Sequence, residues 1–186
     1  MKSKKSIFDA FVNLRSKKEL RKITVKELCE KALINKSTFY TYYEDMFDLS
    51  DKIESEVVDG IVSTISNPQM MIDEPVKFYR SLLGAVSENK KLIDTVFSGS
   101  QHPNLIVKIS KSLKKMTFEN HPEYINDKKI CTILDYAIYG GYYAFVENQE
   151  NTNDYSDELI ESVSVISEHM TKLIKASIPT LKSNNV

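Results

Sequence analysis

Hydrogen-bonding and aromatic side chains are concentrated between positions 36 and 43 of this chain. The segment reads Lys-Ser-Thr-Phe-Tyr-Thr-Tyr-Tyr and supplies a cation, aliphatic hydroxyls and phenols. Such groups bind phosphate oxygens and the polar edges of nucleic-acid bases. If the segment is a helix, Phe39 and Tyr43 fall on a buried stripe, and Lys36, Ser37 and Thr38 occupy an exposed first turn. The spacing therefore predicts recognition of a polar, anionic partner.

The residue types that most often carry catalysis or bind metals are sparse. His102, His121 and His169 are far apart, and Cys29 and Cys131 lack the Cys-x-x-Cys spacing of metal and redox sites. No metalloprotease, nucleophile-elbow or phosphate-loop pattern occurs. We expect no enzymatic activity, no metal and no cofactor, with an enzyme as the alternative from another class. The two cysteines are expected to be reduced and buried.

Two short helices joined by a tight turn are needed to position the polar and aromatic segment at residues 36–43. Thr24 and Glu27 form the signature of a capping box, in which the Thr hydroxyl accepts the N–H of Glu27 and the Glu carboxylate reaches back. Asn35 is a strong N-cap for the second helix. An amphipathic helix over residues 6–14 precedes the pair, and a longer helix over residues 46–65 follows it.

The rest of the chain also has helical patterning. Further helices are expected over residues 75–87, 89–97, 103–118, 127–147 and 154–176. No strand-like alternation, internal repeat or low-complexity segment stands out. We therefore predict an all-α fold, with an N-terminal three-helix domain at residues 1–50 and a larger helical domain at residues 51–186.

Charge is segregated along the chain. Residues 1–50 carry 11 Lys and Arg against 7 Asp and Glu, whereas residues 51–186 carry 14 against 19. A positive head on an acidic body suits a phosphate-binding module, because neutralised phosphates release their counterions. The same excess is also common on solvated surfaces, so charge alone leaves both interpretations open.

The segment from Thr24 to Leu49, TVKELCEKALINKSTFYTYYEDMFDL, resembles the helix-turn-helix of the tetracycline-repressor (TetR) family of bacterial transcriptional regulators. The turn at residues 32–35 and the short helix at residues 36–43 match the family's Ala-Gly-Val-Ser-like turn and its helix ending in Tyr-x-Tyr-Phe. The resemblance implies a DNA-binding helix-turn-helix domain. It also implies that the helical domain behind it binds a ligand and forms a dimer.

The resemblance places DNA contacts on the short helix, where the family contacts match Lys36, Thr38, Tyr40, Thr41 and Tyr42. The start of the preceding helix is expected to touch a phosphate as well, because a helix N-terminus favours an anion. The predicted DNA-contact residues are Thr24, Lys26, Asn35, Lys36, Ser37, Thr38, Tyr40, Thr41 and Tyr42.

Three residues depart from the family pattern. Leu33 replaces a glycine, so the turn needs either a less positive φ or some strain. Thr41 replaces a common histidine, and Met46 replaces a phosphate-binding lysine. The alternative to a DNA-binding segment is a structural hairpin with an aromatic core. Four aromatic rings within five residues argue against it, because a short helix can bury only one face.

Long apolar stripes on the last two helices favour a homodimer through a four-helix interface, which is how the resembling family dimerises. Gly140 and Gly141 would weaken an exposed helix, so they indicate close approach of another helix. The alternative is that both stripes pack within one chain. The predicted interface residues are Ile133, Ala137, Gly140, Gly141, Ala144, Val163, Ile166 and Met170.

Rings and soft side chains in the larger domain suggest a pocket for a fairly apolar small-molecule effector. The predicted pocket residues are Phe78, Tyr79, Phe97, Met116, Phe118, Tyr136, Tyr139 and Tyr143. A plain core role is the alternative for each of them. The resemblance implies a repressor that binds a palindromic operator as a dimer and releases it when the effector binds. An activator, and a head that acts through a protein partner, are the alternatives.

We expect a soluble, cytoplasmic protein without a membrane anchor. The basic residues 1–5 resemble the start of a signal peptide, but Asp9, Asn13 and Arg15 interrupt the segment that follows. Residues 137–146 of the larger domain form a stretch without a charge or a proline, but it holds two glycines and is far shorter than the roughly 20 residues of a membrane-spanning helix.

Overall fold

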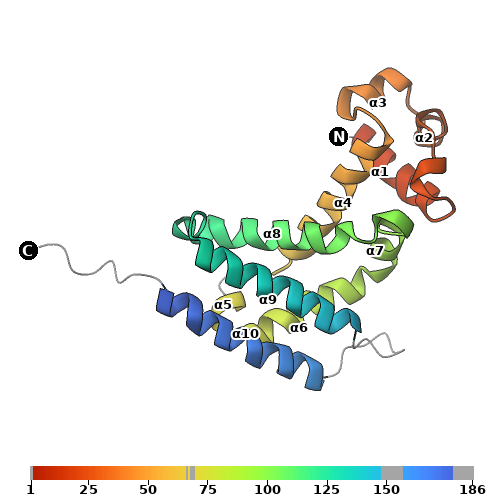
Figure 1. Ribbon diagram of the computed structural model, residues 1–186. Helices are drawn as coiled ribbons and strands as arrows, with labels where there is room; N and C mark the ends of the chain where they lie inside the picture. Colours follow the sequence, from red (N-terminus) through yellow and green to blue (C-terminus); the bar gives the residue numbers. More distant parts are fainter. Residues whose placement is uncertain (1, 66, 68–69, 148–156, 178–186) are drawn as a thin grey trace, which may run out of the picture. The chain divides into compact units, whose positions relative to one another are not determined.

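The fold is all-α, as the sequence predicts (Figure 1). The computed structural model describes residues 2–65, 67, 70–147 and 157–177, and these contain helices and no strand. Short 3-10 turns are η1 (Leu20–Lys22), η2 (Gly99–Gln101) and η3 (Pro122–Tyr124). The α-helices are α1 (Lys2–Arg15), α2 (Val25–Ala32), α3 (Lys36–Tyr42), α4 (Met46–Ser63), α5 (Met70–Asp73), α6 (Pro75–Glu88), α7 (Lys90–Val96), α8 (Asn104–Asn120), α9 (Lys128–Glu147) and α10 (Asp157–Ser177).

The chain divides into two compact units. The first unit comprises Met1–Ile61 together with Glu88–Ile109, and the second comprises Val62–Ser87 together with Ser110–Val186. The head expected at residues 1–50 lies entirely within the first unit. That unit also takes in most of α4, all of α7 and the start of α8, so it is larger than a minimal helix-turn-helix domain.

Helix α1 supplies the apolar centre of the first unit. Most of its predicted stripe is buried, with Ile7 and Phe11 fully inaccessible to solvent, whereas Phe8 is half-buried. Leu28 of α2, Phe39 of α3 and Leu49 of α4 are also fully buried. Full burial of a large apolar side chain stabilises the folded state by roughly 1.5–3 kcal/mol. These side chains anchor the two short helices, α2 and α3, in a core that they share with α1 and α4.

Buried polar groups tie α4 to the later segment of the first unit. Glu54 is fully buried, and its carboxylate accepts hydrogen bonds from the Ser50 hydroxyl (2.8 Å) and the Asn104 amide (3.1 Å). Lys108 donates to the backbone carbonyl of Asp51 (3.0 Å) and pairs with its carboxylate (2.6 Å). A buried charge without partners is costly, so these bonds stabilise the position of the first turns of α8 next to α4.

In the second unit, α9 and α10 run side by side (Figure 1). Gly141 of α9 is buried because Tyr79 of α6 approaches it, and a Cβ at Gly141 would meet the Tyr79 hydroxyl at 3.2 Å. A separate cluster forms from Tyr124, Ile130 and Leu134. Among the residues that the structure describes, no helix is long and apolar enough to cross a membrane.

Candidate nucleic-acid interface

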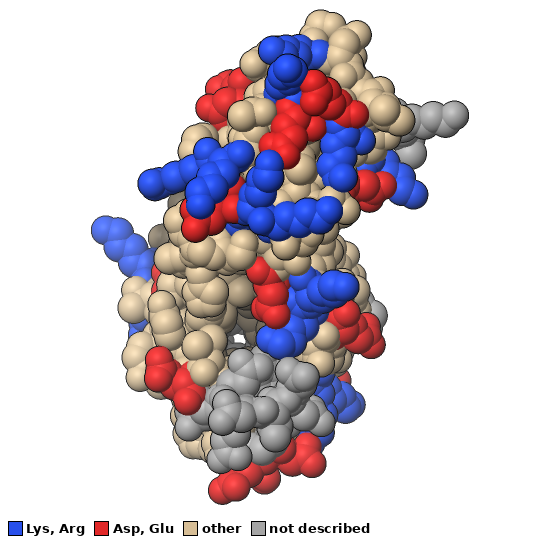
Figure 2. Space-filling model, turned by 90° about the vertical axis from the view of Figure 1, so that its right-hand side faces the viewer, with Lys and Arg blue, Asp and Glu red and all other residues tan. Residues whose placement is uncertain are grey.

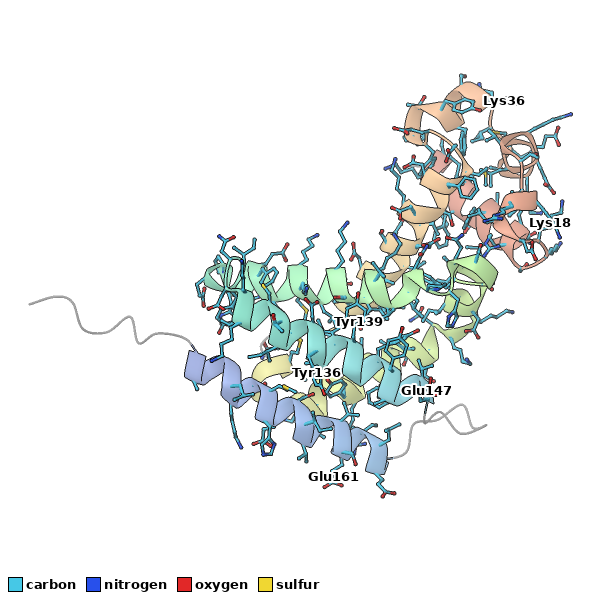
Figure 3. All side chains as sticks on the ribbon, in the orientation of Figure 1. Lys18, Lys36, Tyr136, Tyr139, Glu147 and Glu161 are labelled. Carbon is cyan, nitrogen blue, oxygen red and sulfur yellow. The ribbon has the colours of Figure 1, made fainter. Side chains whose placement is uncertain are left out.

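Thr24 begins α2 as its N-cap, and half of the predicted capping box forms. The Thr24 hydroxyl accepts the backbone N–H of Glu27 (3.2 Å). The Glu27 carboxylate does not return to the cap residue as expected, because it pairs with the Lys18 ammonium (2.5 Å). Lys18 lies in the connection after α1 (Figure 3), so this ion pair ties that connection to the first turn of α2.

The turn between α2 and α3 depends on Leu33, which has a left-handed backbone with φ 55° and ψ 44°. Its N–H donates to the carbonyls of Cys29 and Glu30 and so closes α2. In the described part of the chain, Leu33 is the only non-glycine residue with positive φ. The turn therefore keeps the conformation that glycine favours, at a cost of about 1–2 kcal/mol for a leucine. The Leu33 side chain is 92% exposed.

Asn35 fixes the first turn of α3. Its side-chain oxygen accepts the backbone N–H of Thr38 and the hydroxyls of Ser37 and Thr38, each at 2.7 Å. Both hydroxyl hydrogens are therefore directed at Asn35, and the hydroxyl oxygens are left as acceptors. In the major groove, such acceptors match the amino groups of adenine and cytosine. The turn thus presents an ordered set of polar groups next to Lys36, which marks the start of α3 in Figure 3.

The aromatic run divides between core and surface. Phe39 is fully buried and Tyr43 is 9% exposed, so these rings anchor α3 to its unit. Tyr40 is 57% exposed and meets the Phe39 ring edge-on at 5.3 Å. Tyr42 is half-buried. Burial raises the pKa of Tyr43 and keeps its phenol neutral. The exposed phenol of Tyr40 and the half-exposed one of Tyr42 are left to contact a partner.

The end of α3 is held by a lysine that the sequence interpretation missed. Lys52 of α4 donates to the Tyr42 carbonyl (3.2 Å), pairs with Asp48 (2.8 Å) and lies 5.4 Å from the centre of the Tyr43 ring. The hydrogen bond from Lys52 lowers the pKa of Asp48, whose carboxylate also accepts the N–H of Glu44 (2.9 Å). The spacing of Asp48 and Lys52 is typical of helical ion pairs, so this signal was present in the sequence.

The start of α4 is poorly suited to a phosphate. Met46, which replaces the family's lysine, is 7% exposed. The Asp45 carboxylate caps the helix by accepting the N–H groups of Phe47 (2.7 Å) and Asp48 (2.8 Å). A second anion at this helix end would be repelled by the first. Contacts to an anionic partner are therefore left to α2, α3 and the residues near them.

Carboxylates neutralise several of the cations in the first unit. Lys18 pairs with Glu27, Lys22 with Glu19 (3.7 Å) and the predicted contact residue Lys26 with Glu30 (3.9 Å). In the upper part of Figure 2, basic and acidic side chains are accordingly interspersed. Lys36 has no ion pair with any residue that the structure describes. Its positive charge remains available to a partner.

The predicted DNA-contact residues lie on or directly before α2 and α3, and none of these side chains is buried. The Thr41 hydroxyl is committed to its own helix, because it donates to the Ser37 carbonyl (2.9 Å). The exposed members are Thr24, Lys26, Asn35, Lys36, Ser37, Tyr40 and Thr41, and the half-buried members are Thr38 and Tyr42.

The predicted dimer residues fall into three groups by burial. Gly141 and Val163 are buried inside the second unit, where side-chain atoms of Tyr79 and Val163 both lie within 4 Å of a Cβ built on Gly141. Gly140 is open, with nothing within 4 Å of a Cβ built on it, and Ile166 is 56% exposed. The remaining predicted dimer residues are half-buried; they are Ile133, Ala137, Ala144 and Met170.

The predicted pocket residues are not gathered in one place. Phe97 is buried in the first unit, whereas the others belong to the second. Tyr136 and Tyr143 are 65% and 51% exposed on α9 (Figure 3 labels Tyr136). Tyr79 is buried and shares a hydrogen bond of 2.8 Å with Ser167. The remaining members are Phe78, which is buried, and Met116, Phe118 and Tyr139, which are half-buried.

One curated protein resembles the chain over part of its length. The chain is 30% identical over 53 residues to the uncharacterized HTH-type transcriptional regulator YxbF of Bacillus subtilis (strain 168). The match covers 28% of this chain and 14% of the relative's own length. No protein-family model matches the chain, and no solved structure matches it significantly. The chain is therefore similar, over a minor part of either protein, to a helix-turn-helix transcriptional regulator.

Proposed function

We propose that this protein is a DNA-binding transcriptional regulator that acts by binding rather than by catalysis. The observation that carries the proposal is the division of α3, where Phe39 and Tyr43 are buried while Lys36, Ser37 and Tyr40 are exposed. A recognition helix needs this division, because one side must anchor to the scaffold while the N-terminal turn reaches base edges. The similarity to an HTH-type transcriptional regulator supports the same function.

The finer proposal is a TetR-type repressor that binds a palindromic operator as a homodimer. Exposed apolar side chains on α9 and α10 support a dimer, because contiguous exposed apolar surface marks protein interfaces. These side chains are Tyr136, Tyr143 and Val146 of α9, and Val165, Ile166 and Leu173 of α10. A palindromic operator would require the two copies of α3 in such a dimer to lie about one DNA turn apart.

We further propose that a small-molecule effector binds the second unit and releases the DNA. Buried hydroxyl groups on α10, at Ser164, Ser167 and Thr171, give the interior of this unit a polar side that an effector could use. Ser167 already shares a hydrogen bond with Tyr79. An effector that displaced this bond would have to replace it, because an unpaired buried hydroxyl is costly.

The direct test is DNA binding by fluorescence anisotropy at two or more salt concentrations, using duplexes from the region upstream of the protein's own coding sequence. Lys36→Ala should weaken binding at least tenfold, because it removes the unpaired cation at the start of α3. Lys31→Ala is the matched control, since Lys31 is an exposed lysine in the last turn of α2. Binding that weakens steeply with salt supports phosphate neutralisation. A salt-insensitive interaction would favour a head that acts through a protein partner, and equal affinity of the two variants would contradict the role given to Lys36.

A further inference from the structure

Lys4 lies beside Tyr42 of α3, although the two residues are 38 positions apart in the sequence. Its ammonium nitrogen is 5.5 Å from the centre of the Tyr42 ring, near the end of α3. A cation over the face of an aromatic ring is attracted by the ring's quadrupole, even at an exposed site. The first turn of α1 is therefore held at the same surface as the last turn of α3.

The charge of Lys4 is not neutralised by a neighbouring carboxylate. Within the residues that the structure covers, Lys4 has no ion pair, whereas Lys18, Lys26 and Lys52 each have one. A cation–π contact uses no acceptor oxygen, so ammonium hydrogens that point away from the ring can still donate to an anion. Lys4 thus resembles Lys36 at the opposite end of α3, as an exposed cation whose charge is available to an anion.

A phosphate near Tyr42 would need such a cation. The C-terminal end of a helix carries partial negative charge, which repels phosphate. Lys52 is already committed there, because it donates to the Tyr42 carbonyl and pairs with Asp48. Lys4 has no ion pair among the described residues, so its ammonium can still donate at this end. Its ammonium and the half-exposed phenol of Tyr42 are both hydrogen-bond donors suited to phosphate oxygens.

The length of α3 fits phosphate binding at this end. A helix of seven residues is roughly 10 Å long, which is close to the major-groove width of about 12 Å. If Lys36 and the first turn of α3 reach the base edges, the far end of the helix approaches the backbone that borders the groove. Phosphates are the groups that the residues near Tyr42 would meet.

We propose that the Lys4 ammonium and the Tyr42 hydroxyl form a phosphate-binding pair that engages one backbone phosphate of the DNA. The inference rests on the proposed DNA-binding function and adds α1 to the contact surface. The pair carries no base preference, because phosphates are the same in every sequence. It acts equally on operator and unrelated duplexes and sets the position of α3 in the groove.

The test compares Lys4→Met with Lys5→Met, because Lys5 is an exposed lysine in the same turn of α1. Affinities are measured by anisotropy for an upstream duplex and an unrelated duplex over a range of salt concentrations. Lys4→Met should weaken binding to both duplexes by a similar factor and reduce the slope of log K against log salt by about 0.9. Lys5→Met should change the slope by less than half as much as Lys4→Met does. Urea unfolding of both variants should match wild type.

A double-mutant cycle with Tyr42→Phe tests whether the two groups share one phosphate. This variant keeps the ring under Lys4 and removes the hydroxyl. The combined loss in affinity of Lys4→Met and Tyr42→Phe should be smaller than the product of the single losses. Equal slopes for the Lys4 and Lys5 variants, or fully multiplicative losses, would overturn the pair while DNA binding by wild type stands. Wild-type protein that binds no duplex in a salt-dependent way would overturn the proposed function and the pair together.

Discussion

The guanidinium of Arg15, at the end of α1, donates hydrogen bonds to both the carbonyl (2.9 Å) and the hydroxyl (2.6 Å) of Ser98, although the two residues are 83 positions apart. Arg15 is only 4% exposed and also donates to the carbonyls of Lys18 (3.1 Å) and Val96 (3.3 Å). Burial lowers the pKa of Arg15, and the nearby charge of Glu54 opposes this shift. One side chain thus ties α1 to the segment after α7.

Replacing Arg15 should therefore destabilise the first unit strongly. Arg15→Met leaves buried carbonyl groups unpaired and Glu54 without its neighbouring cation, so we expect a loss of about 3 kcal/mol in the free energy of unfolding. Ser98→Ala should cost about 1–2 kcal/mol, because it removes the hydroxyl that accepts from Arg15 and donates to the Thr95 carbonyl. Urea unfolding followed by circular dichroism measures both. Arg21→Met, at an exposed arginine in η1, is the control and should stay within about 0.5 kcal/mol of wild type. Similar losses for the Arg15 and Arg21 variants would refute the tie.

Leu33→Gly should stabilise the protein. The left-handed backbone at Leu33 costs a leucine about 1–2 kcal/mol, and its exposed side chain makes little compensating contact. Part of the gain is offset, because glycine has more freedom in the unfolded chain. We expect a net increase of about 0.5–1 kcal/mol in the free energy of unfolding. Leu33→Ala keeps the backbone penalty and should change stability little. A less stable glycine variant would mean that the Leu33 side chain has a contact that stabilises the fold.

Stability should fall at alkaline pH in a way that depends on Tyr79. Burial raises the pKa of its phenol, and the hydrogen bond with Ser167 only partly opposes this shift. The unfolded chain therefore loses the proton first, near pH 10. The stabilising contribution is complete below that pH and is lost as the pH rises through the folded-state pKa.

The variant Tyr79→Phe separates this effect from other alkaline changes. It should be less stable than wild type at pH 7, because Ser167 loses its partner, but its stability should fall less steeply between pH 9 and pH 11. The remaining fall comes in part from Tyr43 and Tyr124, whose pKa values burial also raises. Tyr136→Phe, at a ring that is 65% exposed, should keep the wild-type slope. Identical slopes for all three proteins would contradict the assignment to Tyr79.

Ile166→Glu should weaken the proposed dimer. Ile166 is 56% exposed on α10, and a carboxylate there would lose its hydration in an apolar interface. We expect the dimer dissociation constant to rise at least tenfold, which corresponds to about 1.4 kcal/mol. Sedimentation equilibrium measures the change. Val76→Glu places the same charge at an exposed valine of α6 and should leave the dissociation constant unchanged. Wild-type protein that remains monomeric at high concentration would refute the dimer.

The sequence by itself determined the elements that depend on near neighbours. Thr24 and Asn35 mark where α2 and α3 begin, because each cap binds an N–H three residues further along. The spacing of Phe39 and Tyr43 placed both rings on the buried side of α3. The all-α fold follows from the same helical periodicity. Interactions within one helical turn are fixed by local spacing, so they can be predicted without knowledge of the packing.

Only the tertiary structure decided which distant groups meet. Glu27 pairs with Lys18 instead of returning to its own cap, and Gly141 admits a tyrosine of α6 within the same chain. Lys4 lies over Tyr42, and Arg15 binds Ser98. These partners are separated by 9 to 83 positions along the chain. Spacing carries no information about such pairs, because their proximity depends on how whole helices pack around a shared core.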